Sequence, residues 1–340
     1  MIAEALAKIV NSVDLSFGES VEVMTEIMEG RSTPAQLGAF LTALKMKGEV
    51  ADEVAGMASV MRAKSTRIDV ADDVIDTCGT GGDGKGTFNV STAAAFVAAG
   101  VGIKVAKHGN RAMSGSSGSA DVLEALGIDI QVTPEGMSEC IGKTGFGFMF
   151  AQGYHPSMRH AAPTRKEIGI PTVFNILGPL TNPAGAKRQL IGVSDKHKGA
   201  LIANVLKKLG SERAVVVYGE DGLDEITLDG ASILWLLESG SIEEHRIRPQ
   251  DFNLEESSLD VIKVNNAIES ADVIRDILNG RVGPARDIVL MNASAALLAS
   301  GKFKDLETCL VECVKSIDSG LALNVLENCI NFRQGAEWHE

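Results

Sequence analysis

The chain has 340 residues and a formal net charge of −13, and 45% of its residues are hydrophobic against 23% charged. This composition is that of a folded protein, and the length allows two or three domains or one elaborated α/β domain. The negative charge argues against nucleic acid or an anionic membrane surface as a partner, since both attract basic surfaces. We expect neither a membrane span, which needs about 20 apolar residues, nor a secretory signal at the N-terminus.

The cysteines predict a reduced protein. There are five of them, an odd number, and they show no metal-ligand spacing. Disulfides are rare where cellular thiols are kept reduced. We therefore expect a cytoplasmic protein without structural disulfides or zinc.

The first sixty or so residues predict helices only. Ser16–Glu19 has the Ser-x-x-Glu pattern of a capping box, and Thr33–Gln36 repeats it with proline at the first helical position. Gly30 and Gly48 stand where a left-handed residue would end each helix.

From residue 74 onward, strands and helices alternate, which is typical of a parallel sheet with crossover helices. We expect strands at 74–78, 103–106, 146–150, 189–193 and 213–218, and helices from 92 and over 119–126 and 198–209. Residues 155–183 are rich in proline around a short basic helix, and 287–332 are again mostly helical. We expect an α/β protein with a small all-helical domain (1–68 and about 152–186) and a large domain (69–151 and about 187–340) whose mostly parallel central sheet is flanked by helices.

A cluster of glycines follows the first predicted strand. Gly79–Thr87 reads Gly-Thr-Gly-Gly-Asp-Gly-Lys-Gly-Thr and precedes a helix. Backbone N–H groups in such a loop, together with a helix N-terminus, favour a bound phosphate. The loop departs from the ATP-binding P-loop, because Gly86 stands where a hydroxyl residue would hold Mg²⁺. It also departs from the dinucleotide fingerprint, because no acidic residue follows about 20 positions later. A tight surface turn is the alternative.

Two further segments carry hydrogen-bonding groups to the same edge of the predicted sheet. Thr87–Thr92 offers several polar side chains where a helix needs one N-cap, so some of them should face a ligand. Lys107–Arg111 ends the second strand, and its Lys and Arg side chains form charge-assisted bonds to phosphate. Ser114–Ser119 adds hydroxyl donors. A positive pocket in an acidic protein favours a small polyanion, although a solvated turn is the alternative for Lys107–Arg111.

An acidic pair follows the strand that ends near residue 218. Asp224 and Glu225 are adjacent carboxylates. Mg²⁺ binds through one or two carboxylates together with substrate phosphates. The pair therefore indicates a magnesium site beside the glycine loop, with an acidic surface loop as the alternative.

Taken in order, these segments resemble the sequence motifs of a known enzyme family. The runs G-T-G-G-D, T-F-N-x-S-T, K-H-G-N-R, S-G-S-A-D-x-L-E-A-L-G, N-x-L-G-P-L-T-N-P and G-L-D-E resemble those of the anthranilate phosphoribosyltransferases of tryptophan biosynthesis. The likeness extends over nearly the whole chain. It implies a homodimer that transfers the phosphoribosyl group from 5-phosphoribosyl 1-diphosphate to the amine of anthranilate with Mg²⁺ and releases diphosphate.

The resemblance also implies roles for individual residues. The phosphoribosyl diphosphate would bind to Gly79, Gly82, Asp83, Thr87, Asn89, Val90, Ser91, Thr92, Lys107 and Ser119. Mg²⁺ would be served by Ser91, Asp224 and Glu225. Anthranilate would lie against Gly79, His108, Asn110, His155 and Arg165, with Arg165 pairing its carboxylate. No certain catalytic residue emerges, and Lys107, His108 and Asn110 would act by electrostatics and positioning.

Two other functions fit parts of the pattern. A nucleoside phosphorylase of the same fold would release a base in the presence of phosphate and would not need the acidic pair. A non-catalytic nucleotide or nucleic-acid binder would need a basic outer surface, which the charge of −13 argues against.

Overall fold

The computed structural model describes residues 1–71, 73–111 and 118–334. It begins with four helices, α1 (Ile2–Ile9), α2 (Phe17–Met28), α3 (Pro34–Lys47) and α4 (Ala51–Lys64). Both predicted capping boxes are confirmed, because the Ser16 and Thr33 side chains accept the N–H of the residue three positions on, and Glu19 and Gln36 reach back. Val50 has no capping side chain at the start of α4, and Glu53 accepts its N–H instead.

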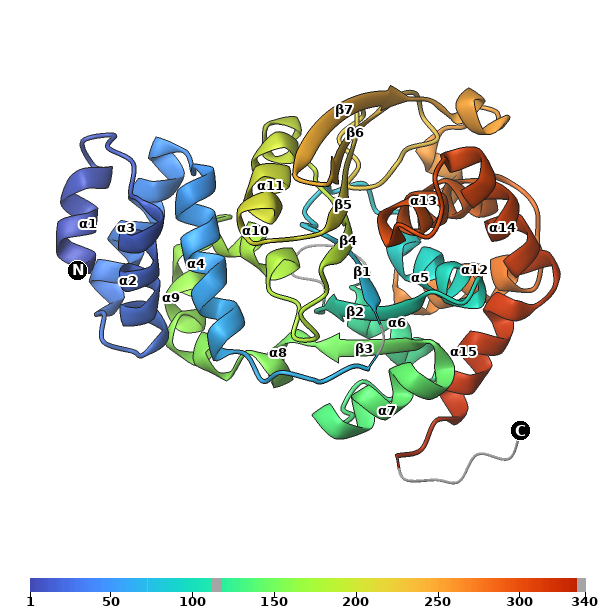
Figure 1. The fold of residues 1–340 in the computed structure, drawn as a ribbon, viewed down its shortest axis with the longest axis horizontal. Coiled ribbons are helices and arrows are strands. Elements are labelled where there is room, and N and C mark those ends of the chain that lie inside the picture. Colours follow the sequence, from blue (N-terminus) through green and yellow to red (C-terminus); the bar gives the residue numbers. More distant parts are fainter. Residues whose placement is uncertain (72, 112–117, 335–340) are drawn as a thin grey trace.

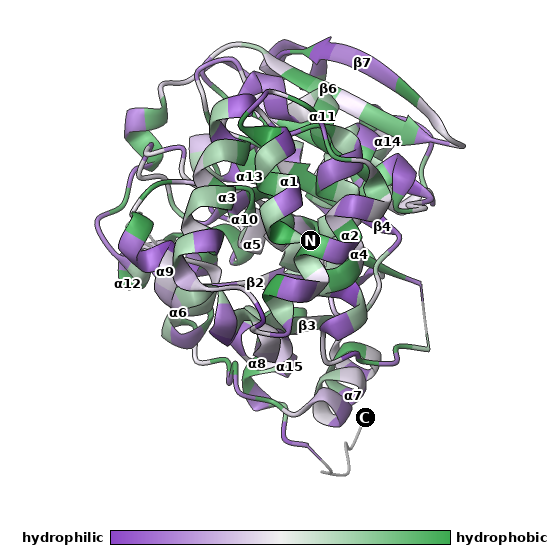
Figure 2. Cartoon of the chain, turned by 90° about the vertical axis from the view of Figure 1, so that its left-hand side faces the viewer, coloured by the Kyte–Doolittle hydropathy of each residue, from purple (hydrophilic) through white to green (hydrophobic). Residues whose placement is uncertain are grey.

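Seven strands form one sheet within the described residues, in the order β3-β2-β1-β4-β5-β6-β7. Five are parallel and match the predicted strands, with β2 extending three residues further than expected: β1 (Val74–Gly79), β2 (Lys104–Gly109), β3 (Phe146–Phe150), β4 (Arg188–Gly192) and β5 (Arg213–Gly219). The antiparallel hairpin of β6 (Ser232–Glu238) and β7 (Ser241–Ile247) was not predicted. Strand β7 is an exposed, hydrophilic edge (Figure 2), so it lacks the apolar pattern that marks a buried strand.

Helices cover both faces of the sheet (Figure 1). In β5, Val215 and Val217 pack into the larger core, whereas Val216 on the opposite face packs into the core that contains α11 (Lys196–Lys208). The larger core is built by α5 (Val90–Gly100), α6 (Ser119–Ala125), α12 (Ala267–Leu278), α13 (Pro284–Ser300), α14 (Leu306–Asp318) and α15 (Leu321–Asn331). Helix α12 was not predicted, and neither was α7 (Pro134–Thr144), which packs on β3.

The proline-rich segment lies against the N-terminal helices. It contains α8 (Ala151–Tyr154), η1 (Pro156–His160), α9 (Ala162–Ile168), α10 (Phe174–Leu177) and η2 (Gly178–Leu180). Helix α9 contacts α3, α10 contacts α4, and η1 contacts α2. These contacts support our proposed division of the chain, although the core of the N-terminal helices continues without a break into the α11 face of the sheet.

The topology decides where a site can form. Five neighbouring strands run in parallel, so the segments after β1, β2, β3, β4 and β5 all leave the same edge of the sheet. In open α/β sheets this carboxyl edge is where ligands bind. None of the helices in the described parts of the chain is long and apolar enough to cross a membrane.

Candidate active site at the carboxyl ends of the parallel strands

The glycine loop between β1 and α5 has an ordered backbone. Gly81, Gly82, Gly84 and Gly86 all have φ between 65° and 79°, a region that residues with side chains rarely adopt. The Gly86 carbonyl accepts the N–H of Val264 at 2.9 Å, which ties the end of the loop to the segment before α12. A Cβ added at any of the four positions would meet no atom within 4 Å apart from its chain neighbours. The loop is therefore a preformed cradle.

The start of α5 combines its cap with further polar groups. Asn89 is the N-cap, and its Oδ1 accepts the Thr92 N–H at 3.1 Å and lies 3.4 Å from Ser91 Oγ. Thr87 forms an isolated bridge with Lys263, and the Val90 side chain packs into the core. The Thr92 hydroxyl is buried without a partner among the described residues. The cap uses Asn89, which leaves Ser91 to face the site.

The loop after β5 packs directly against the glycine loop. The Gly81 N–H donates to Asp224 Oδ2 at 2.8 Å. A Cβ at Gly79 would lie 2.5 Å from that oxygen, and one at Gly192 would lie 1.6 Å from the Asp224 carbonyl oxygen. Glycine is thus required at the ends of β1 and β4 so that the acidic pair can approach.

The carboxylates of this site are crowded. Burial and the neighbouring Asp83 raise the pKa of Asp224 to about 7, and the two carboxyls hydrogen-bond to each other. Burial and Asp224 together raise the pKa of Glu225, which accepts a hydrogen bond from the Ser91 backbone. Carboxyls that are buried and crowded in this way favour the protonated form unless positive charge is brought to them.

Lys107 is the cation buried at the centre of the site. Its side chain, 1% exposed, donates to the Thr77 carbonyl oxygen and to Ser91 Oγ at 3.1 Å. Burial lowers the pKa of Lys107, and the nearby acidic groups, Asp76 foremost, oppose that shift. The ammonium therefore lies between the end of β1 and the start of α5, close enough to the acidic pair to feel its charge.

Arg111 does not contribute the second cation that the basic turn predicted. Its guanidinium pairs with Asp121 at 2.7 Å and with Glu124 at 2.6 Å, and it lies over the Phe150 ring. The expectation of a free arginine in the pocket is wrong, because two carboxylates of α6 already neutralise it. Residues 114–117 of the predicted serine turn lie outside the described residues.

Two histidines meet near the carboxyl ends of β2 and β3: His108 is the second-to-last residue of β2, and His155 follows β3. Their ring centroids are 5.1 Å apart. His108 Nδ1 donates to the Gly178 carbonyl at 3.2 Å, and a ring N–H of His155 donates to the Thr181 carbonyl. Burial, with a smaller contribution from His155, lowers the pKa of His108 to about 3, and burial lowers that of His155 to about 4. Both rings are neutral at pH 7, and each Nε2 is buried without a partner among the described residues.

The other residues expected at the aromatic substrate are less enclosed. Arg165 in α9 is half-buried, and its guanidinium lies 4.8 Å from the centre of the Phe174 ring. No carboxylate pairs with it within the described ranges, and burial lowers its pKa. Asn110 is exposed, and its backbone carbonyl accepts a hydrogen bond from the Ser119 hydroxyl at 3.3 Å.

Sequence reasoning missed the residues that hold Lys107 and the glycine loop. Asp76 and Thr77 are fully buried in β1, where Asp76 accepts the His108 N–H and Thr77 accepts from Lys107. Ser194, after β4, donates to the Gly81 carbonyl at 3.2 Å. Polar residues in a strand with both faces buried are unusual, so Asp76 and Thr77 could have been recognised from the sequence.

The donor set suits Mg²⁺ bound together with a phosphate ligand. No group of three or more His, Cys, Asp or Glu side chains is arranged to hold an ion among the described residues. Mg²⁺ needs only one or two carboxylates when substrate phosphates complete its shell. Asp224 and Glu225, whose raised pKa values reflect crowded charge beside an open cradle, fit that requirement.

Comparisons with known proteins define the class. Residues 71–323 match the α/β domain of a glycosyl transferase family, and residues 3–65 match the helical bundle domain of such a family. The chain is therefore a two-part glycosyl transferase. It is 52% identical to the anthranilate phosphoribosyltransferase of Dehalococcoides mccartyi and 47% identical to that of Methylobacillus flagellatus, each over 98% of both chains. The chain belongs to the anthranilate phosphoribosyltransferase family.

Solved structures agree with this assignment. The anthranilate phosphoribosyltransferase of Thermus thermophilus is 41% identical, with a TM-score of 0.91 over 96% of this chain and 98% of the other. The Saccharomyces cerevisiae enzyme in complex with PRPP and Mg is 30% identical, with a TM-score of 0.89 over 97% of each chain. The same yeast enzyme has been solved with 4-fluoroanthranilate, at 29% identity and a TM-score of 0.86 over 97% of this chain and 98% of the other.

Proposed function

We propose that this chain transfers the phosphoribosyl group of 5-phosphoribosyl 1-diphosphate to the amine of anthranilate, releasing diphosphate, and that Mg²⁺ serves the reaction. The family supplies the activity. The observation that carries it for this chain is the meeting of the glycine loop, Lys107 and the Asp224–Glu225 pair at one edge of the sheet. The acidic pair is more than 100 residues away in sequence from both the glycine loop and Lys107. If these segments were only a surface turn and an acidic loop, they would have no reason to meet.

The diphosphate would lie in the glycine cradle. We assign its binding to the loop at Gly79, Gly82 and Asp83, to Thr87, Asn89, Val90, Ser91 and Thr92 at the start of α5, and to Lys107 and Ser119. Backbone N–H groups and one buried ammonium stabilise charge on departing oxygens without reorganising, because they are fixed before the substrate arrives. Bound Mg²⁺, held by Asp224, Glu225 and Ser91, supplies positive charge to the diphosphate.

The reaction needs little covalent chemistry from the protein. Loss of diphosphate leaves positive charge on the ribose, as in glycosidase transition states. An aryl amine is uncharged at neutral pH and needs no strong base before it attacks. The chain's task is to hold the amine in line with the breaking bond.

The two histidines fit positioning better than proton removal. A pKa of about 3 makes His108 a weak base, whereas its unpartnered Nε2 remains a hydrogen-bond acceptor. The Nε2 atom of His155, which lies nearby and is also without a partner among the described residues, is a second acceptor. We assign both to the anthranilate side together with Gly79 and Asn110. We assign the substrate carboxylate to Arg165, whose guanidinium pairs with no carboxylate in the described ranges.

The decisive experiment is an assay of the purified chain. Anthranilate fluorescence should disappear and diphosphate should appear when both substrates and Mg²⁺ are present, and omission of Mg²⁺ or of either substrate should stop both signals. A parallel reaction with nucleosides and inorganic phosphate tests phosphorolysis. Persistent anthranilate fluorescence at high enzyme concentration would overturn the proposal, and release of a free base would assign the phosphorylase instead.

We also propose a cytoplasmic homodimer. Large apolar side chains remain exposed on the helical part, at Met1, Val10, Val13, Phe17, Met46 and Ile170, which supports a second copy as a partner there. All five cysteines are free, as is usual for a reducing compartment. Light scattering behind a sizing column tests the dimer, and a monomeric mass at micromolar concentration would contradict it.

A further inference from the structure

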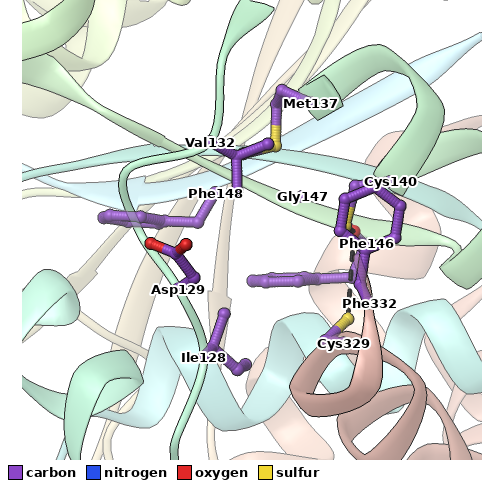
Figure 3. A pocket seen from close by; sticks show the side chains of 10 residues that line it. All are labelled: Ile128, Asp129, Val132, Met137, Cys140, Phe146, Gly147, Phe148, Cys329 and Phe332. Atoms are coloured by element: carbon purple, nitrogen blue, oxygen red, sulfur yellow. Dashed lines mark hydrogen bonds between the residues drawn. The ribbon is translucent and has the colours of Figure 1, made fainter. Parts of the chain in front are cut away.

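Two thiols from distant parts of the sequence meet at the amino end of β3. Cys140 lies in α7 and Cys329 in α15, and both face the Phe146 carbonyl (Figure 3). Cys140 Sγ is 3.4 Å from the Phe146 oxygen and 3.8 Å from Thr144 Oγ1. Cys329 Sγ is 3.9 Å and 3.4 Å from the same two atoms. The two thiols also hydrogen-bond to each other.

A small cavity adjoins the pair. It has a volume of about 20 Å³, and its lining includes both thiols, Met137, Phe148 and the exposed Asp129. A cavity of this size accepts a molecule about as large as water. The cavity therefore brings space for about one water molecule beside the thiols, and Cys140 and Cys329 keep 7% and 5% of their surface exposed.

The two thiols differ in acidity. The hydrogen bond from Cys329, with that from Thr144, lowers the pKa of Cys140. The same contact with Cys140, together with burial, raises the pKa of Cys329. The thiolate is the form that attacks an oxidant, so Cys140 reacts first and Cys329 is placed to resolve it.

We propose that Cys140 and Cys329 are a peroxide-responsive thiol pair that closes reversibly into a disulfide joining α7 to α15. The Cys140 thiolate attacks one oxygen of hydrogen peroxide. An S–O bond forms, the O–O bond breaks, and hydroxide leaves and takes up the thiol proton as water. The Cys329 sulfur then attacks the sulfenic sulfur, so that the S–S bond forms, the S–O bond breaks and a second water carries away the Cys329 proton. Both sulfurs are oxidised and both peroxide oxygens are reduced.

The disulfide would close a loop of more than half the chain. Such a link restricts the unfolded chain and so raises the stability of the folded state. It lies at the amino end of β3, whereas His155 and the site lie beyond its carboxyl end. We therefore expect greater heat resistance and an unchanged reaction rate.

The test uses the wild-type protein treated with hydrogen peroxide. Peptide mapping without reduction should find one crosslink, between the peptides that contain Cys140 and Cys329, and dithiothreitol should reverse it. The thermal midpoint should rise by roughly 5 °C in the oxidised protein and return on reduction. Sulfenic or sulfinic acid without this crosslink, or a crosslink between other cysteines, would overturn the proposal.

Matched variants separate the pair from the other buried thiols. Cys329→Ser should abolish the crosslink and leave Cys140 as the cysteine that oxidises. Cys309→Ser is the control, because Cys309 is also buried but its nearest thiol, Cys313, lies on the same helix one turn away. It should leave the crosslink and the shift in midpoint intact. Loss of both in Cys309→Ser would count against the pair.

Discussion

The two halves of the site hold their polar groups in opposite ways. In the half that we assign to diphosphate, Lys107, Asp224 and Glu225 are ionisable groups close to one another, and the pKa values of the two acids are raised. In the half assigned to anthranilate, His108 and His155 are neutral, and their pKa values are lowered. The first half is suited to balancing charge that arrives with a ligand. The second is suited to an uncharged amine on a flat ring.

The largest effect should follow from removing the buried ammonium. Lys107→Met deletes charge-assisted hydrogen bonds worth about 1.5–3 kcal/mol each, so kcat/KM should fall about 10²–10⁴-fold if two are lost. Steady-state kinetics measure this. Lys104→Met is the control, because Lys104 is at the other end of β2 and reaches the Gly142 carbonyl. Equal losses in both variants would show that the charge at position 107 has no special role.

The anthranilate half should be sensitive to Arg165. Arg165→Ala should raise the KM for anthranilate about 10–100-fold, since one charge-assisted contact is lost, and should change the KM for phosphoribosyl diphosphate much less. Arg111→Ala removes a similar charge that is already paired on the surface and should change neither. If Arg165→Ala changed both KM values equally, Arg165 would not be the carboxylate partner.

Loss of one carboxylate of the acidic pair should raise the Mg²⁺ concentration that the reaction needs. Asp224→Asn keeps the shape of the side chain and the contact from the Gly81 N–H but removes one of two metal-binding carboxylates. The Mg²⁺ concentration for half-maximal activity should rise roughly tenfold. A magnesium titration at saturating substrates measures it. An unchanged titration would remove Asp224 from the metal site.

The smallest effect is a pH dependence of stability in the metal-free protein. The pKa of Asp224 is about 7 when folded and near 3.8 when unfolded, so its contribution to stability is complete below about pH 4 and is lost as pH rises from there to 7. The thermal midpoint in EDTA should therefore fall between pH 5 and pH 7 and level off above pH 7, and Mg²⁺ should reduce the fall. Asp224→Asn should flatten the profile.

His108 and His155 should not affect the pH dependence of the reaction. Both stay neutral above pH 5, so kcat should show no acidic limb near pH 6.5, and such a limb would contradict their low pKa values.

Local rules were enough for much of the fold. The capping boxes at Ser16 and Thr33 and the five parallel strands could be predicted, because caps and buried apolar runs are written in neighbouring residues. The β6–β7 hairpin could not, since β7 is an exposed edge strand whose polar residues carry no strand pattern. The glycine loop and the acidic pair were predictable as segments, and a parallel sheet implied that they share an edge.

The sequence by itself determined which chemical groups this protein has and which edge of the sheet carries them. Only the tertiary structure decided their state. Arg111 is neutralised by two carboxylates of α6, and the histidines are made neutral by burial. Cys140 and Cys329 lie next to each other only because α7 and α15 both pack beside β3. Charge state and pairing depend on the distance to groups far along the chain and on exclusion of water, and neither is a property of a local run of residues.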